Sequence, residues 1–263
     1  MLSLYQEKAP KPLTLDSSFT FWCHAGLSCF NQCCRQAVII VSPYDILRLA
    51  RRLGLSSGEF LKRYTYREVE EKSRLPLVLL RPPRDAENGC PFLTPQGCAV
   101  YEDRPAACRL FPITQGSRLT EQGMEDYYFC RVLPFCQGFA EAREWTVASW
   151  QAAQGFQEFD VPRRGWLEII LTWGRGGLPP ADAAAQALFY LVAYDLDSFR
   201  KFVLESAFLK VNRVDADTAT RLRTDDLALL TFGYSYLRAE LWRTLDSTAT
   251  SNDLSSHQEI KPL

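Results

Sequence analysis

The sequence has little that would suit it to bind nucleic acid, to enter a membrane or to coordinate a metal through imidazole. Its 263 residues carry a net charge of -1 at pH 7, so no bulk field attracts nucleic acid or an acidic lipid surface. No apolar run approaches the ~18 residues of a spanning helix. The first ten residues show no basic segment followed by an apolar one, so no secretory signal is expected. We expect a cytoplasmic protein with no nucleic-acid or membrane partner.

Histidine is scarce and cysteine is abundant. Two histidines in the whole chain nearly exclude a metal site built on several imidazoles. Nine cysteines all lie in one half of the chain, and none follows Cys136. Disulfides that staple a secreted fold should also tie down the second half, and an odd number cannot pair completely. In a reducing compartment, clustered cysteines usually bind metal. The candidate metal ligands are Cys23, Cys29, Cys33, Cys34, Cys90, Cys98, Cys108, Cys130 and Cys136.

The spacing of the thiols bears on the identity of the metal. Cys23 to Cys34 form a C-x5-C-x3-C-C run, and Gly26 and Asn31 permit the turns that would bring its thiols together. Thiolates select zinc or iron–sulfur clusters over hard cations. Structural zinc usually uses short C-x(2–4)-C knuckles, and this chain has no C-x-x-C. Adjacent side chains tend to diverge, so the Cys33–Cys34 pair suits one tetrahedral ion poorly. We favour an iron–sulfur cluster, most simply [4Fe–4S]. Zinc, two separate centres, and a set of buried structural thiols or disulfides remain as alternatives.

Three motifs in order carry a resemblance to a known family. After the first cysteine run come G-C-P-F-L with a later C-x-V-Y at 89–101, and then R-P-x-x-C-R-x-F-P at 104–112. This order resembles the YkgJ-type cysteine-cluster family, described as a zinc- or iron-chelating domain. It is also similar to the N-terminal part of flagellin lysine N-methylases. The resemblance covers roughly residues 21 to 138.

The resemblance implies a cysteine-ligated metal centre, and the methylase likeness implies an iron–sulfur cluster associated with methyl transfer to lysine. On that interpretation the chain acts in, or supports, a modification of a protein substrate, or it transfers electrons. Its first cysteine gap is five residues, longer than in many members. Its second half has no obvious glycine-rich loop for S-adenosylmethionine. Two other functions stay open. In one, the chain is a zinc-binding module that docks a protein partner. In the other, it is a metal carrier or sensor.

Two arginines flank Cys108. Arg104 and Arg109 could donate hydrogen bonds to cluster sulfurs or bind an anionic substrate, so they are candidate cofactor-binding residues. The alternative is structural. Arg104 would then pair with a neighbouring acid, and Arg109 would hold loop carbonyls. His24 follows Cys23 and is a weaker candidate ligand.

The pattern along the chain predicts a mainly α protein, in which a cysteine-rich, metal-organised N-terminal region with little sheet packs on a C-terminal helical bundle. We expect four parts, namely an extended arm at 1–17, the cysteine-cluster domain at 18–138, a helical domain at 139–246 and a disordered tail at 247–263.

Local signals predict individual elements. Ser42 and Pro43 open a helix that ends near Leu53, and a capping box at Ser56 opens another through Tyr64. A strand is expected at 75–80, with no long regular element from there to residue 138. Further helices are expected at 139–154, 162–173, 181–211 and 224–245.

Overall fold

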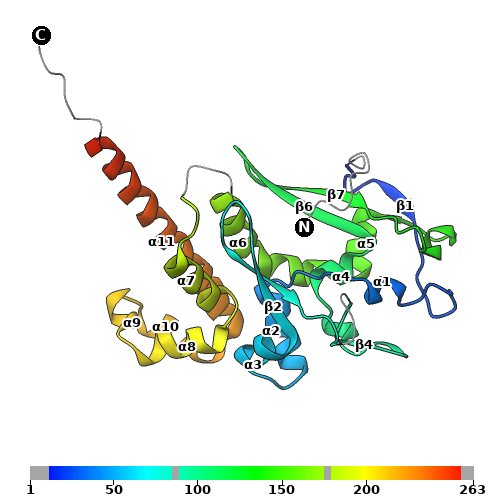
Figure 1. Cartoon of the computed structure of the whole chain (residues 1–263), viewed down its shortest axis with the longest axis horizontal. Helices are drawn as coiled ribbons and strands as arrows, with labels where there is room; N and C mark the ends of the chain where they lie inside the picture. The colour runs from blue at the N-terminus through cyan, green and yellow to red at the C-terminus, as the bar shows by residue number, and fades with distance from the viewer. Residues whose placement is uncertain (1–11, 85–88, 175–178, 256–263) are drawn as a thin grey trace, which may run out of the picture.

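The computed structural model describes residues 12–84, 89–174 and 179–255, and side chains as far as residue 240. The fold is mainly α, as the sequence predicts, with only small sheets (Figure 1). The described residues form α1 (Gln32–Arg35), α2 (Pro43–Arg52), α3 (Ser57–Tyr64), α4 (Ala106–Leu110), α5 (Val147–Ala153), α6 (Phe156–Gly174), α7 (Ala183–Ala193), α8 (Leu196–Glu205), α9 (Phe208–Val211), α10 (Ala216–Thr224) and α11 (Asp226–Ser255).

The strands pair into four two-stranded antiparallel ladders within the described ranges. The strands are β1 (Ser18–Thr20), β2 (Thr65–Val69), β3 (Pro76–Leu80), β4 (Leu93–Thr94), β5 (Gly97–Cys98), β6 (Ile113–Thr120), β7 (Gly123–Cys130) and β8 (Glu144–Thr146). The pairs are β1 with β8, β2 with β3, β4 with β5, and β6 with β7. The strand expected at 75–80 is therefore confirmed as β3. Short 3₁₀ turns lie at Tyr101–Asp103 and Gln137–Ala140.

The two helices predicted from their N-terminal signals are confirmed as α2 and α3. In each, a serine hydroxyl accepts from the backbone N–H three residues on, and an acid at that position accepts from the serine N–H. These capping boxes satisfy donors that a helix start would otherwise leave unpaired. In α2 the acid is Asp45, which is buried, whereas Glu59 in α3 stays exposed.

The expectation of no long regular element between 80 and 138 is wrong. Strands β6 and β7 form an eight-residue ladder, in which Ile113 pairs with Cys130 and Thr120 pairs with Gly123. The strand signal lies in the aromatic run at Tyr127, Tyr128 and Phe129, which favours strand. The density of cysteine, proline and glycine nearby concealed that signal.

The single long helix predicted over residues 181–211 is also wrong, because the structure divides this segment into α7, α8 and α9. Helix α7 ends at Ala193, and the side chain of Asp195 accepts from the N–H of Ser198 to cap a new helix. Asparagine, aspartate and serine favour such caps over helix interiors. The apolar spacing continues across the break, so periodicity alone did not locate it.

Two predicted helix boundaries shift for tertiary reasons. Residues 144–146 pair with β1 instead of forming helix, so only the end of the helix expected over 139–154 appears, as α5. Helix α6 begins at Phe156 and contains Pro162 in its interior, although Pro162 is expected at the first helical position. Buried Phe156 and Phe159 outweigh the backbone hydrogen bond that this proline removes.

Helix α11 continues ten residues beyond the end predicted at Leu245. That stretch contains neither glycine nor proline, so nothing in it breaks a helix. Residues 256–263 of the predicted tail and residues 1–11 of the predicted arm lie outside the described residues. Leu13, near the end of that arm, forms a bridge with Tyr128.

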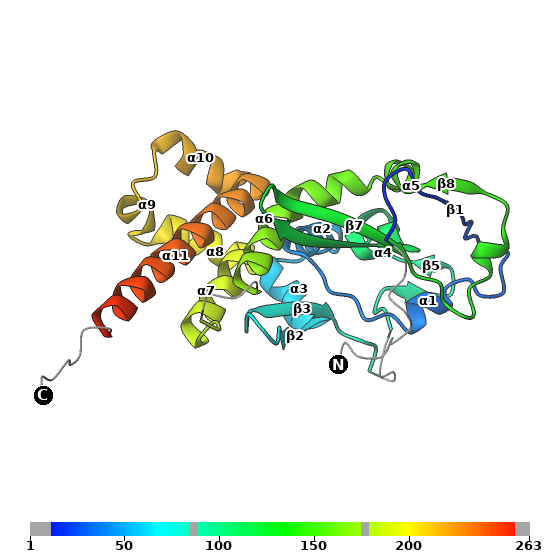
Figure 2. The same ribbon diagram turned by 90° about the horizontal axis from the view of Figure 1, so that it is seen from above.

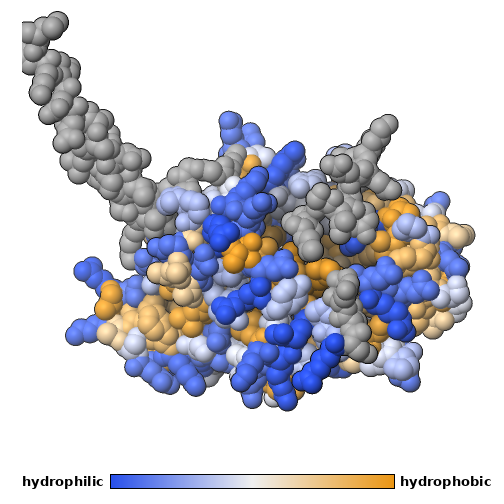
Figure 3. All heavy atoms as spheres, in the orientation of Figure 1, coloured by the Kyte–Doolittle hydropathy of each residue, from blue (hydrophilic) through white to orange (hydrophobic). Residues whose placement is uncertain are grey.

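One connected hydrophobic core runs through the described part of the chain, from Phe21 to Leu237. Helices α7 to α11 lie at one end of the molecule and β1, β8 and α1 at the other, with α6 between them (Figure 2). None of the helices in the described ranges combines the length and the apolar character that crossing a membrane requires. Apolar residues gather at the end that carries β1 (Figure 3). Leu15 and Trp22, which precede and follow β1 in the chain, are both exposed.

Candidate metal centre

All nine cysteines are free thiols. Cys23 is exposed, Cys29 is buried, and the other seven are half-buried. The alternative of a disulfide framework therefore has no support in the structure. The thiols come from segments that are distant in the sequence, and the fold brings several of these segments together.

The first cysteine run folds back on itself around Asn31. This residue adopts a left-handed conformation with φ of 68°, which asparagine tolerates better than most residues. Backbone bonds from Gln32 N to Cys29 O (3.0 Å) and from Cys34 N to Asn31 O (3.1 Å) hold the turn. As a result the Sγ atoms of Cys33 and Cys34 lie 3.9 Å apart. The expectation that these neighbouring side chains diverge is wrong, because the short helix α1 presents both thiols on one side.

The segment at 136–138 packs against the start of the cysteine run. The N–H of Trp22 donates to the carbonyl of Gly138 (2.9 Å), and the N–H of Gln137 donates to Sγ of Cys29 (3.3 Å). A Cβ at position 138 would lie 2.7 Å from the Phe21 ring and 3.0 Å from the Trp22 carbonyl oxygen, so only glycine permits this approach. These contacts place Cys136 beside Cys29 and the start of the run.

The segment around Cys90 packs against the other side of the run. The N–H of Cys90 donates to the carbonyl of Cys34 (2.9 Å), and that of Gly89 donates to the carbonyl of Ala37 (3.3 Å). Gly89 has φ of +124°, and a Cβ there would lie 3.0 Å from the Arg35 carbonyl oxygen. This backbone conformation is available to glycine alone at little cost, which explains the G-C order in the G-C-P-F-L motif.

Phe92 anchors the segment that carries Cys90 and Cys98 to the hydrophobic core. Its ring is buried and lies 5.1 Å from Tyr64 and 6.4 Å from Phe60, measured between ring centroids. Strands β4 and β5 then pair Leu93 with Cys98. The tight hairpin turns the chain back, so that Cys98 returns towards Cys90.

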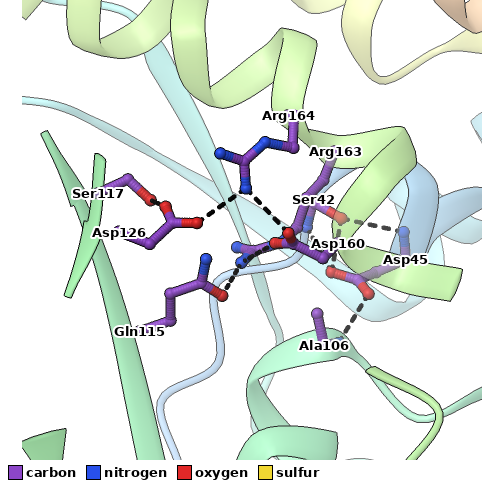
Figure 4. Close-up of polar contacts among 9 residues, drawn as sticks. All are labelled: Ser42, Asp45, Ala106, Gln115, Ser117, Asp126, Asp160, Arg163 and Arg164. Carbon is purple, nitrogen blue, oxygen red and sulfur yellow. Dashed lines mark hydrogen bonds and ion pairs between the residues drawn. The ribbon is translucent and has the colours of Figure 1, made fainter. Parts of the chain in front are cut away.

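Cys108 lies on the short helix α4, and the buried carboxylate of Asp45 holds the start of that helix. Oδ1 of Asp45 accepts from the N–H of Ala106 (2.8 Å), while Oδ2 accepts from the N–H (2.8 Å) and hydroxyl (2.7 Å) of Ser42 (Figure 4). One carboxylate therefore joins the beginnings of α2 and α4. This link was not predicted from the sequence. The capping box signals the contact with Ser42, but no local pattern signals the one with Ala106.

Cys130 ends strand β7, and ion pairs fasten this hairpin to α6. Nη1 of Arg164 lies 2.8 Å from Asp126 Oδ2 and 3.0 Å from Asp160 Oδ2 (Figure 4). Nη2 of Arg163 donates to Oε1 of Gln115 (2.7 Å) on the facing strand. All these groups are at least partly shielded from solvent, so they fix the hairpin more firmly than exposed pairs would.

The thiols perturb one another's ionisation. A hydrogen bond with the Cys34 thiol lowers the pKa of Cys33 to about 7, and the positive charge of Arg131 acts in the same direction. The same hydrogen bond, followed by burial, raises the pKa of Cys34. Arg131 follows a cysteine directly in the sequence, but its effect on Cys33 was not foreseen.

Burial is the main cause of the shift at the remaining perturbed thiols. It raises the pKa of Cys23, of Cys90 and of Cys130 to about 11, and that of Cys108 well above its ordinary value. A thiol that burial keeps protonated releases its proton when a metal cation binds, because the cation stabilises the thiolate.

The two candidate arginines bond to loops. Arg104 donates to the carbonyl of Tyr101 (2.6 Å) and to Gln154 Oε1 (2.7 Å). Arg109 donates to the carbonyls of Gln154 (2.7 Å) and Glu102. These contacts match the structural alternative for Arg109. For Arg104 the partners are a carbonyl and an amide, whereas that alternative names a neighbouring acid. A contact of either arginine with a cofactor stays a prediction.

His24 lies at the edge of the cysteine run. Its Nδ1 accepts from the N–H of Gly26 (3.1 Å), and its Nε2 lies 3.8 Å from a carboxylate oxygen of Glu141. Both nitrogens therefore have neighbours other than a metal.

The donor set fits a soft metal, although the thiols are not gathered into a finished coordination shell. In the described ranges, no three histidine, cysteine or acidic side chains converge closely enough to hold one ion. Metal binding therefore requires the thiols to rotate inward. Free thiols in adjoining segments, with few imidazoles or carboxylates among them, are the ligands of zinc and iron–sulfur groups.

Comparison with known proteins agrees with this chemistry. Neither the curated proteins nor the solved structures include a match to the chain. Residues 23–137 match the model of a family described as "CxxCxxCC: Putative zinc- or iron-chelating domain". The match begins at the first cysteine and ends one residue after the last. It supports metal binding by this cysteine-rich part of the chain, with zinc and iron both within the family's description.

Proposed function

We propose that residues 23–137 hold a resident metal group through cysteine thiolates, and that this group is iron–sulfur in kind. The observation that carries the proposal is the packing of two distant segments against the same short run. Gln137 N contacts the Cys29 sulfur, and Cys90 N contacts the Cys34 carbonyl. Together these segments supply more thiols than one tetrahedral ion can use.

The ligand arrangement favours a cluster over a single ion. A cluster presents iron corners several ångströms apart, so its ligands can come from segments that do not share one knuckle. Here they come from the first run, the β4–β5 hairpin, helix α4 and the segment after β7. When bound, such a group supplies one-electron chemistry or an iron site for substrate atoms. The chain's own residues supply thiolates and exclude water through Phe92 and Phe21, both of which are buried.

One distance favours zinc as the second candidate. Two thiolates on one tetrahedral ion with a metal–sulfur distance of about 2.3 Å lie roughly 3.8 Å apart. The Cys33 and Cys34 sulfurs are 3.9 Å apart. This pair could therefore share one ion without backbone movement. In that case the protein is a zinc-binding module whose helical part contacts a protein partner.

Metal analysis distinguishes the candidates. The full chain is purified anaerobically, and iron, acid-labile sulfide and zinc are measured per chain alongside the visible spectrum. We expect iron and sulfide in equal amounts with a brown colour. Zinc without colour would refute the cluster and leave the thiolate site standing.

A double variant tests whether the thiols hold the metal. Cys33→Ser with Cys34→Ser should lower the bound metal by at least half, because serine is a poor ligand for soft ions. Ser28→Ala in the same loop is the matched control and should keep the wild-type content. Equal metal content in both variants would refute ligation by these thiols.

A further inference from the structure

We propose that the chain forms a two-fold symmetric dimer through helix α11, in which the projecting end of α11 from each copy lies in a groove on the other copy. The groove lies between α6 and the first half of α11, and its volume is about 590 Å³. The inference concerns the helical end of the molecule, so its outcome does not depend on the metal group.

The groove follows two helices that run in parallel. A Cβ at Gly165 would lie 2.6 Å from the Tyr234 ring. Further along both helices, Nη1 of Arg238 lies 2.8 Å from Oε2 of Glu168. The two contacts come in the same order along α6 and α11, so these helices point the same way. The α11 residues that line the groove recur at i, i+4, i+7 and i+11, which places them on one face of the helix. They are Leu227, Thr231, Tyr234 and Arg238.

Apolar side chains in this groove are exposed to solvent. Val161 of α6 is 60% exposed and Leu227 of α11 is 44% exposed. The three charged residues that line the groove are Arg164, Glu168 and Arg238, and all three form ion pairs. Because these charges are already neutralised, the groove suits the apolar face of a helix better than an ionic ligand.

The length of α11 identifies the occupant of the groove. Helix α11 continues to Ser255, and its second half projects beyond the other elements (Figure 1, Figure 2). At 1.5 Å per residue, residues 241–255 span about 22 Å, and the groove face from Leu227 to Arg238 spans about 17 Å. The projecting end cannot reach the groove of its own chain, because the two are consecutive parts of one helix. It can lie in the groove of a second copy.

The sequence of α11 continues the spacing of the groove face. Steps of three and four residues beyond Arg238 lead to Leu241, Leu245, Thr248 and Asn252. The same spacing marks the shared side of helices that pair along their length. In an antiparallel pair centred between positions 239 and 240, position 245 of one copy lies opposite position 234 of the other, and position 252 lies opposite position 227. Each contact occurs twice, as two-fold symmetry requires.

Sedimentation equilibrium of the full chain tests the dimer. The wild type is expected to be dimeric. Leu227→Lys places an unpaired charge in each of the two grooves, so we expect the dissociation constant of the dimer to rise about 100-fold or more. Val211→Lys is the matched control, because Val211 is 74% exposed on α9 and does not line the groove. Its dissociation constant should equal that of the wild type.

A second substitution tests the antiparallel arrangement. Asn252→Glu combined with Leu227→Lys puts opposite charges at facing positions, and should lower the dissociation constant about tenfold relative to Leu227→Lys alone. No such recovery would overturn the antiparallel arrangement. A monomeric wild type, or an unchanged dissociation constant in Leu227→Lys, would overturn the dimer itself. If circular dichroism shows that Leu227→Lys is unfolded, Val161→Lys on the α6 side of the groove takes its place with the same expected result.

Discussion

Replacing Asp45 with asparagine removes one acceptor from a buried site that needs two. The carboxylate accepts from Ser42 N–H, from the Ser42 hydroxyl and from Ala106 N–H, at 2.7–2.8 Å. Asparagine keeps one oxygen, which can still serve Ser42. Its NH₂ group then faces the N–H of Ala106, and a buried donor without an acceptor costs about 1–3 kcal/mol.

A smaller effect opposes this loss. Burial raises the pKa of the Asp45 carboxyl, and the bonds from Ala106 and Ser42 lower it in part. The charged form is therefore costly to bury, and neutral asparagine relieves that cost. Because the Ala106 N–H remains in the interior with nothing to accept it, we expect a net destabilisation of about 1–2 kcal/mol.

Urea unfolding followed by tryptophan fluorescence measures the change. With a slope of about 3 kcal/mol per molar urea, the midpoint should fall by roughly 0.3–0.7 M. Glu59→Gln is the matched control, because Glu59 makes the same capping box with Ser56 but is exposed. Water can replace the lost acceptor there, so its midpoint should stay close to that of the wild type.

The same variant reports on the metal site. Asp45 fixes the start of α4, which carries Cys108. Asp45→Asn should therefore lower the metal content per chain and speed the release of metal to a chelator. An unchanged midpoint together with unchanged metal content and release would show that the Asp45–Ala106 bond neither stabilises the fold nor positions Cys108.

Two further predictions follow from close packing and from the thiol pKa shifts. Gly165→Ala places a Cβ 2.6 Å from the ring of Tyr234, so we expect a loss of about 1–3 kcal/mol by calorimetry. Gly58→Ala, whose Cβ would lie 3.5 Å from its nearest neighbour, should stabilise by about 0.5 kcal/mol; equal effects would contradict the packing argument. In metal-stripped protein, Cys33 should be alkylated first, since its hydrogen bond with Cys34 lowers its pKa to about 7. Its rate should rise with pH through neutrality as the thiolate forms, and peptide mapping that shows no preference for Cys33 would contradict this.

Local chemistry in the sequence was sufficient for several features. Ser42 with Pro43 and the capping box at Ser56 fixed the starts of α2 and α3, because these residues suit the first turn of a helix whatever surrounds it. The confinement of nine cysteines to one half of the chain, with two histidines in all, predicted metal binding, which the family match supports. Those signals depend only on neighbours along the chain.

Other features carried local signals that apolar periodicity does not detect. The division of one predicted helix into α7, α8 and α9 follows the cap at Asp195, and the β6–β7 hairpin follows an aromatic run that nearby cysteines, prolines and glycines concealed. The sequence predicted that Cys33 and Cys34 diverge, whereas a left-handed Asn31 turns both thiols to one side.

Which cysteine-bearing segments lie side by side was decided by tertiary structure alone. Spacing along the chain favoured a [4Fe–4S] cluster and left two separate centres as an alternative. Cys90 lies beside Cys34 and Cys136 beside Cys29 because backbone hydrogen bonds close two long loops against one short run. Gly89 and Gly138 permit those approaches, since a Cβ at either position would meet backbone of the facing segment. The candidate ligands can thus be identified from single residues, whereas the proximity of the segments that carry them is a property of the closed fold.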